Sequence, residues 1–192
     1  MKTLNTNKNL SDEQLAVLSL EDHLSFSVLM NRYQDKLLNY IRRISGLSFD
    51  DARDVLQDIF LKVYLNLNDF DRDLKFSSWI YSIARNQVIS NYRKIKVRPE
   101  GSAIPIDENV IQKFIYDFDI EKEIDIKITN KKIFSVLDDL KQKWKEVLVL
   151  KFFEEKDYNE ISDIIKKPVG TVASIINKAK KEFKKKYQEN FN

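Results

Sequence analysis

The chain has 192 residues, enough for one or two domains that each bury a hydrophobic core. Its 33 Lys and Arg against 30 Asp and Glu give a formal net charge of +3, which is too small by itself to indicate a nucleic-acid-binding protein. There is no cysteine, only one histidine (His23) and no glycine-rich phosphate loop or metal-ligand cluster, so we expect no enzyme, no metal site and no cofactor.

The polar first residues, MKTLNTNKN, do not form a signal peptide, and no apolar run approaches the length that spans a bilayer. The absence of cysteine is consistent with a reducing compartment. We therefore expect a cytoplasmic protein without membrane insertion.

Residues 10–97 are predicted to form a small helical domain. Apolar residues recur there at helical spacing, and almost no segment of the chain alternates with a period of two. One stripe consists of Phe26, Met30, Tyr33, Leu37, Tyr40 and Ile44, and a second of Ala52, Val55, Leu56, Ile59, Phe60 and Val63. This pattern predicts an all-α protein.

The helix expected over residues 50–66 has an acidic outer face. Asp54, Gln57 and Asp58 point away from its apolar stripe. Solvation is the usual reason for such residues. Paired carboxylates also serve acid-base or metal chemistry, but no histidine accompanies them here.

A third helix is expected from Ser77 to about Lys96, with Ile80, Ile83, Ala84 and Val88 on its inner face. Its outer stripe mixes cations with other side chains: Arg85, Ile89, Tyr92, Arg93 and Lys96. Aromatic rings among cations suit single-stranded DNA, because rings stack on unpaired bases and cations meet phosphates. Trp79 lies nearer the apolar side and is interpreted first as a core residue.

Residues 98–125 are predicted to form an acidic flexible linker, because they contain Pro99, Gly101 and Pro105 and clearly more acidic than basic residues. Apolar residues within this stretch suggest that part of it packs: Ile111, Phe114, Ile115, Tyr116 and Phe118. The linker would join two small helical domains.

The second domain is expected over residues 126–189. Asp157 and Glu160 fit a capping box at the start of a short amphipathic helix, and Pro168 suits the first turn of the next helix. That helix has an apolar stripe of Val172, Ile176, Ala179 and Phe183, and six lysines lie between Lys178 and Lys186. The pair is either a DNA-binding helix-turn-helix or an ordinary αα-hairpin with a solvated lysine face.

Three motifs carry a resemblance to a known family. ARDVLQDIF (52–60), FSSWIYSIARN (76–86) and PVGTV (168–172) are similar, in order and spacing, to the extracytoplasmic-function (ECF) class of bacterial RNA polymerase sigma factors. The similarity covers nearly the whole chain outside the linker and the first few residues. It implies that residues 10–97 are the region 2 domain, which docks on core polymerase and melts the promoter −10 element, and that residues 126–189 are the region 4 domain, which binds the −35 element.

The resemblance also implies residue roles. In region 2, Asn68–Phe76 corresponds to the segment that captures a flipped base. The residues expected to dock on the clamp helices of the largest polymerase subunit are Asp51, Asp54, Gln57 and Asp58. The residues expected to bind DNA in region 2 are Asn68, Phe76, Ser77, Arg85, Asn86, Tyr92, Arg93 and Lys96. Those expected to bind DNA in region 4 are Thr171, Ala173, Ser174, Asn177, Lys178 and Lys181. The flap of the second-largest subunit and an anti-sigma factor are further implied partners.

The sequence departs from the family pattern in region 4. Ala173 and Ile175 stand where basic residues are usual, Lys178 where Arg is usual and Lys166 where a turn glycine is usual. Binding is therefore expected to rely more on other lysines: Lys180, Lys181, Lys184 and Lys185.

The main alternative function is a free-standing helix-turn-helix regulator, which would bind duplex DNA without polymerase. It would leave the Trp79 helix and the acidic face unexplained. A pure protein-interaction module would leave the basic stripes without a role.

Overall fold

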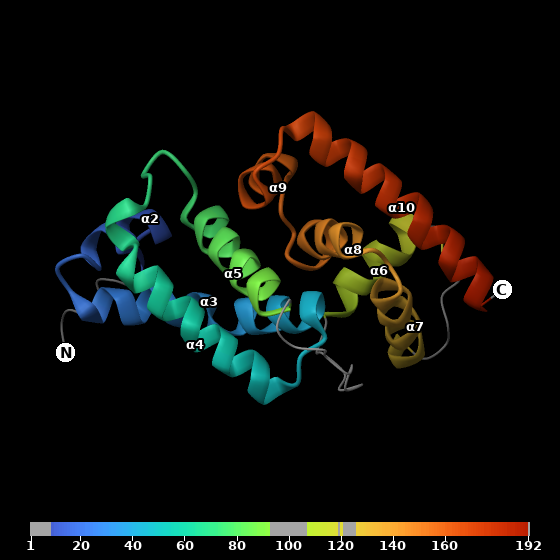
Figure 1. Cartoon of the computed structure of the whole chain (residues 1–192), viewed down its shortest axis with the longest axis horizontal. Helices are drawn as coiled ribbons and strands as arrows, with labels where there is room; N and C mark the ends of the chain where they lie inside the picture. Colours follow the sequence, from blue (N-terminus) through green and yellow to red (C-terminus); the bar gives the residue numbers. More distant parts are fainter. Residues whose placement is uncertain (1–8, 93–106, 119, 121–125, 192) are drawn as a thin grey trace. The chain divides into compact units, whose positions relative to one another are not determined.

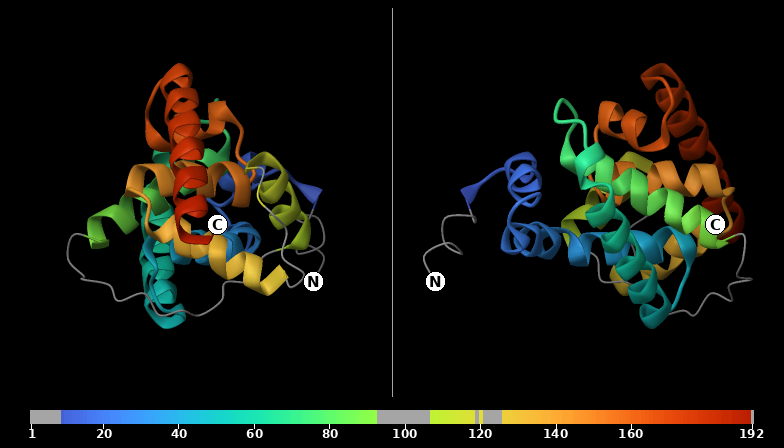
Figure 2. Two further views of the ribbon diagram at one scale, coloured as in Figure 1. Left: turned by 90° about the vertical axis from the view of Figure 1, so that its right-hand side faces the viewer. Right: turned by 60° about the vertical axis from the view of Figure 1, so that its left-hand side comes forward.

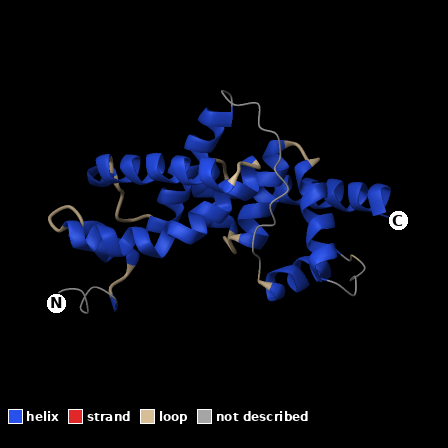
Figure 3. Cartoon of the chain, turned by 90° about the horizontal axis from the view of Figure 1, so that it is seen from below, coloured by secondary structure: helices blue, strands red, loops and turns tan. Residues whose placement is uncertain are grey.

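The computed structural model describes residues 9–92, 107–118, 120 and 126–191. Every regular element in these residues is a helix and none is a strand, which confirms the predicted all-α fold (Figure 3). They form two compact units, of which the first contains α2 to α5 and the second contains α6, α7, α8, η3 and α10 (Figure 1). No helix in the described part of the chain combines the length and apolarity needed to cross a bilayer.

The first unit is a bundle in which α3, α4 and α5 pack pairwise and α2 lies against α3 and α5 (Figure 2). Both predicted stripes face its core, with only Phe26 and Phe60 half-buried. Its elements are α2 (Asp12–Leu18), α3 (His23–Ser45), α4 (Phe49–Leu65), the 3-10 helix η2 (Leu67–Asp69) and α5 (Phe76–Tyr92).

The boundaries of these helices follow from their capping residues. Ser11 and Gln14 form a capping box on α2, Asp22 accepts from the Leu24 and Ser25 amides of α3, and Ser48 caps α4. α3 ends at Gly46, whose φ of 71° lies in the left-handed region that favours glycine. A sharp turn to α4 follows.

The second unit is organised around α10, red in Figures 1 and 2, which packs against α7 and α8. The predicted stripe from Val172 to Phe183 is fully buried and continues to Tyr187. The elements after residue 106 are α6 (Glu108–Phe118), α7 (Ile126–Asp138), α8 (Gln142–Leu148), the π-helical turn η3 (Val149–Phe153), α9 (Tyr158–Ile165) and α10 (Val169–Phe191).

Part of the stretch expected to be a linker is a packed helix. α6 buries Ile111, Phe114 and Phe118, and the Phe114 ring lies 5.1 Å from Phe183 and 5.2 Å from Phe152 between centroids. This agrees with the apolar residues noted within residues 98–125 and moves the start of the second folded unit to α6. Residues 98–106, 119 and 121–125 lie outside the described residues.

α9 and α10 are joined by a short turn, as the sequence predicts. The capping box of Asp157 and Glu160 is present on α9. α9 ends at Lys166, and α10 begins directly after Pro168, whose carbonyl accepts from the Thr171 and Val172 amides. Pro168 thus marks the start of the second helix, and α9, the turn and α10 form a helix-turn-helix.

Candidate nucleic-acid interface

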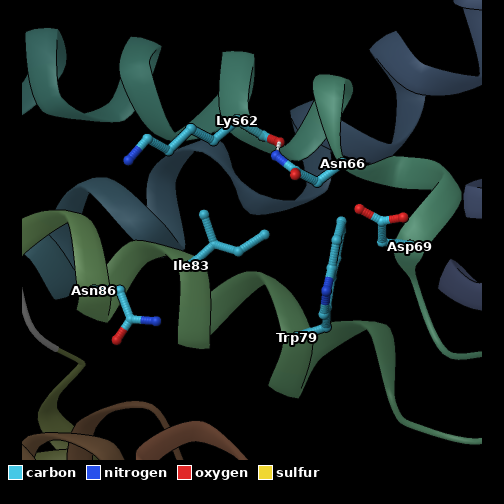
Figure 4. Close-up of a pocket in the computed structure, with 6 residues that line it drawn as sticks. All are labelled: Lys62, Asn66, Asp69, Trp79, Ile83 and Asn86. Atoms are coloured by element: carbon cyan, nitrogen blue, oxygen red, sulfur yellow. Dashed lines mark hydrogen bonds between the residues drawn. The ribbon is translucent and has the colours of Figure 1, made fainter.

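A pocket of about 340 Å³ lies between α4, η2 and α5 in the first unit (Figure 4). α4 and the residue that ends it supply one wall, α5 supplies the facing wall and η2 closes one end. The lining residues are Lys62, Asn66, Asp69, Trp79, Ile83 and Asn86.

The polar groups of this pocket are held in place. Asn66 donates from its amide to the Lys62 carbonyl at 2.7 Å, which also caps the end of α4. The Lys62 ammonium donates to the Gln87 amide oxygen at 2.5 Å. In the view of Figure 4, Lys62 and Asn86 lie toward one end, Trp79 and Asp69 toward the other, and Ile83 lies between them.

These groups match the requirements of an unpaired nucleobase. A base removed from its helix needs an aromatic face to stack on, amide groups for its Watson–Crick edge and a cation for its phosphate. Trp79 is the ring, Asn66 and Asn86 are the amides, and Lys62 is the cation. The pocket therefore has the chemistry to hold one flipped base.

Three aromatic residues form the pocket's structural support. Trp79 lies 5.3 Å from Phe70 and 5.6 Å from Phe76 between ring centroids, and the Phe76 ring meets Tyr33 edge-on at 5.5 Å. Phe76 is completely buried, so the expectation that its side chain binds DNA is corrected: its ring belongs to the core and supports Trp79. Trp79, interpreted first as a core residue, is half-buried and also faces the pocket.

The other region 2 candidates are only partly brought together. Asn86 is exposed and lines the pocket, and Asn68 is exposed on the neighbouring η2. Arg85 and Ser77 are half-buried, with the Arg85 guanidinium 3.5 Å from the Asn86 amide oxygen. Tyr92 is the last described residue of α5, without a described side chain, and Arg93 and Lys96 lie outside the described residues.

Sequence reasoning missed several residues of this pocket. Lys62 and Asn66 lie at the C-terminal end of α4 and belong to none of the three motifs. Ile83 is predicted on the inner face of α5, whereas the structure places it in the pocket lining. Gln87 was also missed: it is buried, accepts from Lys62, and donates to the Asp58 carboxylate at 3.1 Å. The sequence signal for this link is a glutamine at a position that the helical period places on the apolar face of α5.

The predicted docking residues are all exposed on α4: Asp51, Asp54, Gln57 and Asp58. Two of them also have structural contacts. Asp51 accepts from the Ser48 hydroxyl at 2.7 Å at the start of the helix, and Asp58 accepts from Gln87. The same exposed side of α4 continues into Leu61, 58% exposed, and Leu65, 67% exposed. An acidic face with an apolar extension is suited to a protein partner.

The helix-turn-helix presents most of the region 4 candidates to solvent. Thr171, Ser174, Asn177, Lys178 and Lys181 are exposed on α10, and Ala173 and Ile175 are half-buried. Lys180, expected to contribute to DNA binding, is half-buried, and its ammonium packs over the Phe118 ring at 5.3 Å and the Phe152 ring at 5.6 Å. The exposed members of the candidate set therefore lie between Thr171 and Lys181 on α10.

Comparison with known families gives two matches. The family described as Sigma-70 region 2 matches residues 29–98, and the family described as Sigma-70, region 4 matches residues 136–185. The first match contains the pocket and the acidic face of α4, and the second contains the helix-turn-helix.

Individual proteins are similar over most of the chain. ECF RNA polymerase sigma factor SigW of Bacillus subtilis is 29% identical over 181 residues, which cover 88% of this chain and 91% of SigW. RNA polymerase sigma factor YlaC of Bacillus subtilis is 30% identical over 162 residues, covering 84% of this chain and 91% of YlaC. The structure of CnrH in complex with the cytosolic domain of CnrY has a similar fold, with a TM-score of 0.69, 21% identity, and coverage of 94% of this chain and 99% of that one.

Proposed function

The chain belongs to the ECF class of bacterial RNA polymerase sigma factors, which direct the core enzyme to promoters, and we propose a division of that work between its two units. The first unit, residues 10–97, docks on core polymerase and opens the −10 element. The second, residues 126–189 extended by α6, binds the −35 element as duplex DNA. The intervening residues connect them.

In this proposal the pocket of the first unit holds one flipped base of the non-template strand. The observation that carries it is the convergence of Trp79, Asn86 and Lys62 on one cavity. Extruding a base costs a few kcal/mol, so a protein that binds the extruded base stabilises melted DNA without hydrolysing anything. Promoter opening is then a binding reaction, and no catalytic group, metal or cofactor is required.

Arg85, Tyr92, Arg93 and Lys96 would extend this site along the single strand, since cations and rings at helical spacing suit phosphates and unpaired bases. Asn68 and Ser77, next to the pocket in the chain, would contact the same segment. Phe76 is omitted because its ring is buried.

We assign polymerase docking to the exposed side of α4, with Asp51, Asp54, Gln57 and Asp58 against the clamp helices of the largest subunit. The second unit would meet the flap of the second-largest subunit. In DNA recognition, Thr171, Ser174, Asn177, Lys178 and Lys181 would enter the groove or meet the backbone, while the half-buried Ala173 would contribute little.

We also propose that the protein acts in the cytoplasm, because its proposed partners, core polymerase and promoter DNA, are there. An anti-sigma factor is proposed as a further partner, because the class resemblance implies one and because the similarly folded CnrH is in complex with another protein's cytosolic domain. We propose no enzymatic activity.

The test uses holoenzyme with the full chain and promoter fragments that contain a premelted bubble. Each non-template position of the bubble is changed in turn, and holoenzyme affinity is measured. The wild-type protein is expected to prefer one base at one position, and Asn86→Ala is expected to lose that preference while keeping its affinity for core polymerase.

Ser90→Ala is the matched control, because Ser90 is exposed on the same helix but does not line the pocket. It is expected to keep the base preference. Retained preference in Asn86→Ala would overturn the assignment of the pocket.

A further inference from the structure

A carboxylate from the N-terminal helix α2 sits at the start of α5, the helix that supplies half of the pocket. The Phe76 amide, the first of α5, donates to Glu13 Oε1 at 3.1 Å across 63 positions of the chain. α5 has no acidic residue in its own first turn. Because helix N-termini are stabilised by carboxylates, Glu13 supplies from another helix what α5 lacks.

α2 is itself anchored to α3 by a small polar network. The Arg32 guanidinium donates to Asp12 Oδ1 at 2.7 Å and to the Leu10 carbonyl at 2.9 Å, and the Tyr33 hydroxyl donates to Asp12 Oδ2 at 2.5 Å. Burial and the Asp12 hydrogen bond raise the pKa of Tyr33 above its ordinary value of 10, so its hydroxyl remains a donor to Asp12 into the alkaline range. Glu13, the next residue after Asp12, is thereby held at a fixed place.

The cap lies at one boundary of the base-capturing segment. Phe70 and Phe76 flank the loop of residues 71–75, and their rings lie 5.4 Å apart. Both support Trp79, which follows Phe76 by less than one helical turn and lines the pocket. A shift of the first turn of α5 would therefore move the stacking ring directly.

We infer that Glu13 is a positioning residue for promoter opening, which fixes the first turn of α5 and with it the Trp79 wall of the pocket. This inference rests on the proposed function of the pocket. α2 lies before residue 29, where the region 2 match begins, so the match to that region does not account for the helix.

The experiment compares holoenzymes containing the full-length wild type, Glu13→Ala and Glu13→Gln on a promoter with 2-aminopurine at the flipped position. Gln keeps an amide oxygen as acceptor for the Phe76 amide, whereas Ala removes the acceptor. Glu13→Ala is expected to reduce open complexes about fivefold, a factor typical of a lost helix cap. Closed complexes and affinity for core polymerase are expected to stay at the wild-type level, and Glu13→Gln is expected to recover most of the opening.

Asp22→Ala is the control for general stability, because it removes the corresponding cap from α3 in the same unit. Its melting temperature is expected to fall as in Glu13→Ala, while promoter opening and the quenching of 2-aminopurine by Trp79 are expected to stay at the wild-type level. Equal losses of opening in the two variants, or no rescue by Gln, would overturn the inference.

Asn86→Ala separates this inference from the proposal on which it rests. If Asn86→Ala reduces opening and Glu13→Ala does not, only the role of Glu13 is wrong. If Asn86→Ala has no effect on opening, the pocket assignment fails and the role of Glu13 fails with it.

Discussion

Lys166 occupies a backbone conformation that usually requires glycine. It ends α9 with φ 54° and ψ 54°, in the left-handed region, where a side chain crowds the following carbonyl. Lys166→Gly is therefore expected to raise the free energy of unfolding of the second unit by about 1 kcal/mol. Urea unfolding followed by Trp144 emission in a Trp79→Phe background measures this change. Lys167→Gly, which lacks a positive φ, should bring no gain, and an equal gain would contradict the explanation.

Asp22 is a titrating helix cap. Hydrogen bonds from the Ser25 hydroxyl and then the Leu24 amide lower its pKa below the ordinary value of 3.8. A folded pKa below the unfolded value means that its stabilisation is present above about pH 3.8 and is lost as the pH falls through the folded pKa. The melting temperature of Asp22→Asn, which cannot titrate, is expected to lie below wild type at pH 6, and the difference is expected to shrink as the pH falls through the folded pKa, which lies below 3.8. A difference that stays constant over this pH range would refute this.

At the scale of single elements, α6 is held by its aromatic face. Phe114 is fully buried, stacks on Phe118 at 4.1 Å and meets Phe183. Phe114→Ala is expected to destabilise the second unit by about 3–5 kcal/mol, as measured by denaturant unfolding. Tyr116→Ala on the same helix is the control, because Tyr116 is 87% exposed and its loss should change stability by less than about 0.5 kcal/mol. Equal effects would mean that α6 does not belong to the folded unit.

Elements with a strong apolar period were predictable from sequence. The stripes of α3, α4 and α10, the Asp157 capping box and the start at Pro168 depend on residues within one or two helical turns. The pocket was not predictable, because Lys62 and Trp79 line the same cavity only through the packing of α4 on α5. The burial of Phe76 and the packing of Lys180 over Phe118 were not predictable for the same reason: sequence does not distinguish a ring or ammonium that packs inward from one that faces DNA.

At the scale of the whole molecule, the two small surfaces proposed to bind DNA predict a dependence on polymerase. Each surface offers few phosphate contacts, so the isolated protein is expected to bind promoter duplex weakly. Polymerase that engages both units would convert two weak contacts into one strong association. Mobility-shift titrations with and without core enzyme measure the difference. Tight, sequence-specific binding by the protein alone would instead support a free-standing helix-turn-helix regulator.

The proposed division of promoter opening and duplex binding between the units predicts different defects for two double variants. Lys62→Met with Asn86→Ala changes the pocket, so the closed complex should form normally and the open complex should be reduced. Permanganate reactivity of unpaired thymines reports that loss. Lys178→Ala with Lys181→Ala changes the exposed face of α10. Recruitment should then weaken, and the slope of log affinity against log salt should fall by about one for each lost phosphate contact.

A premelted bubble template distinguishes these two defects, because it removes the energetic cost of opening but leaves the upstream duplex unchanged. It should restore transcription by the pocket variant and not by the α10 variant. Lys131→Ala serves as the control, since Lys131 is an exposed lysine of the second unit that lies on α7 rather than on α10; recruitment should change less. If the bubble restores both double variants equally, or neither, then melting and duplex recognition are not divided between the pocket and α10.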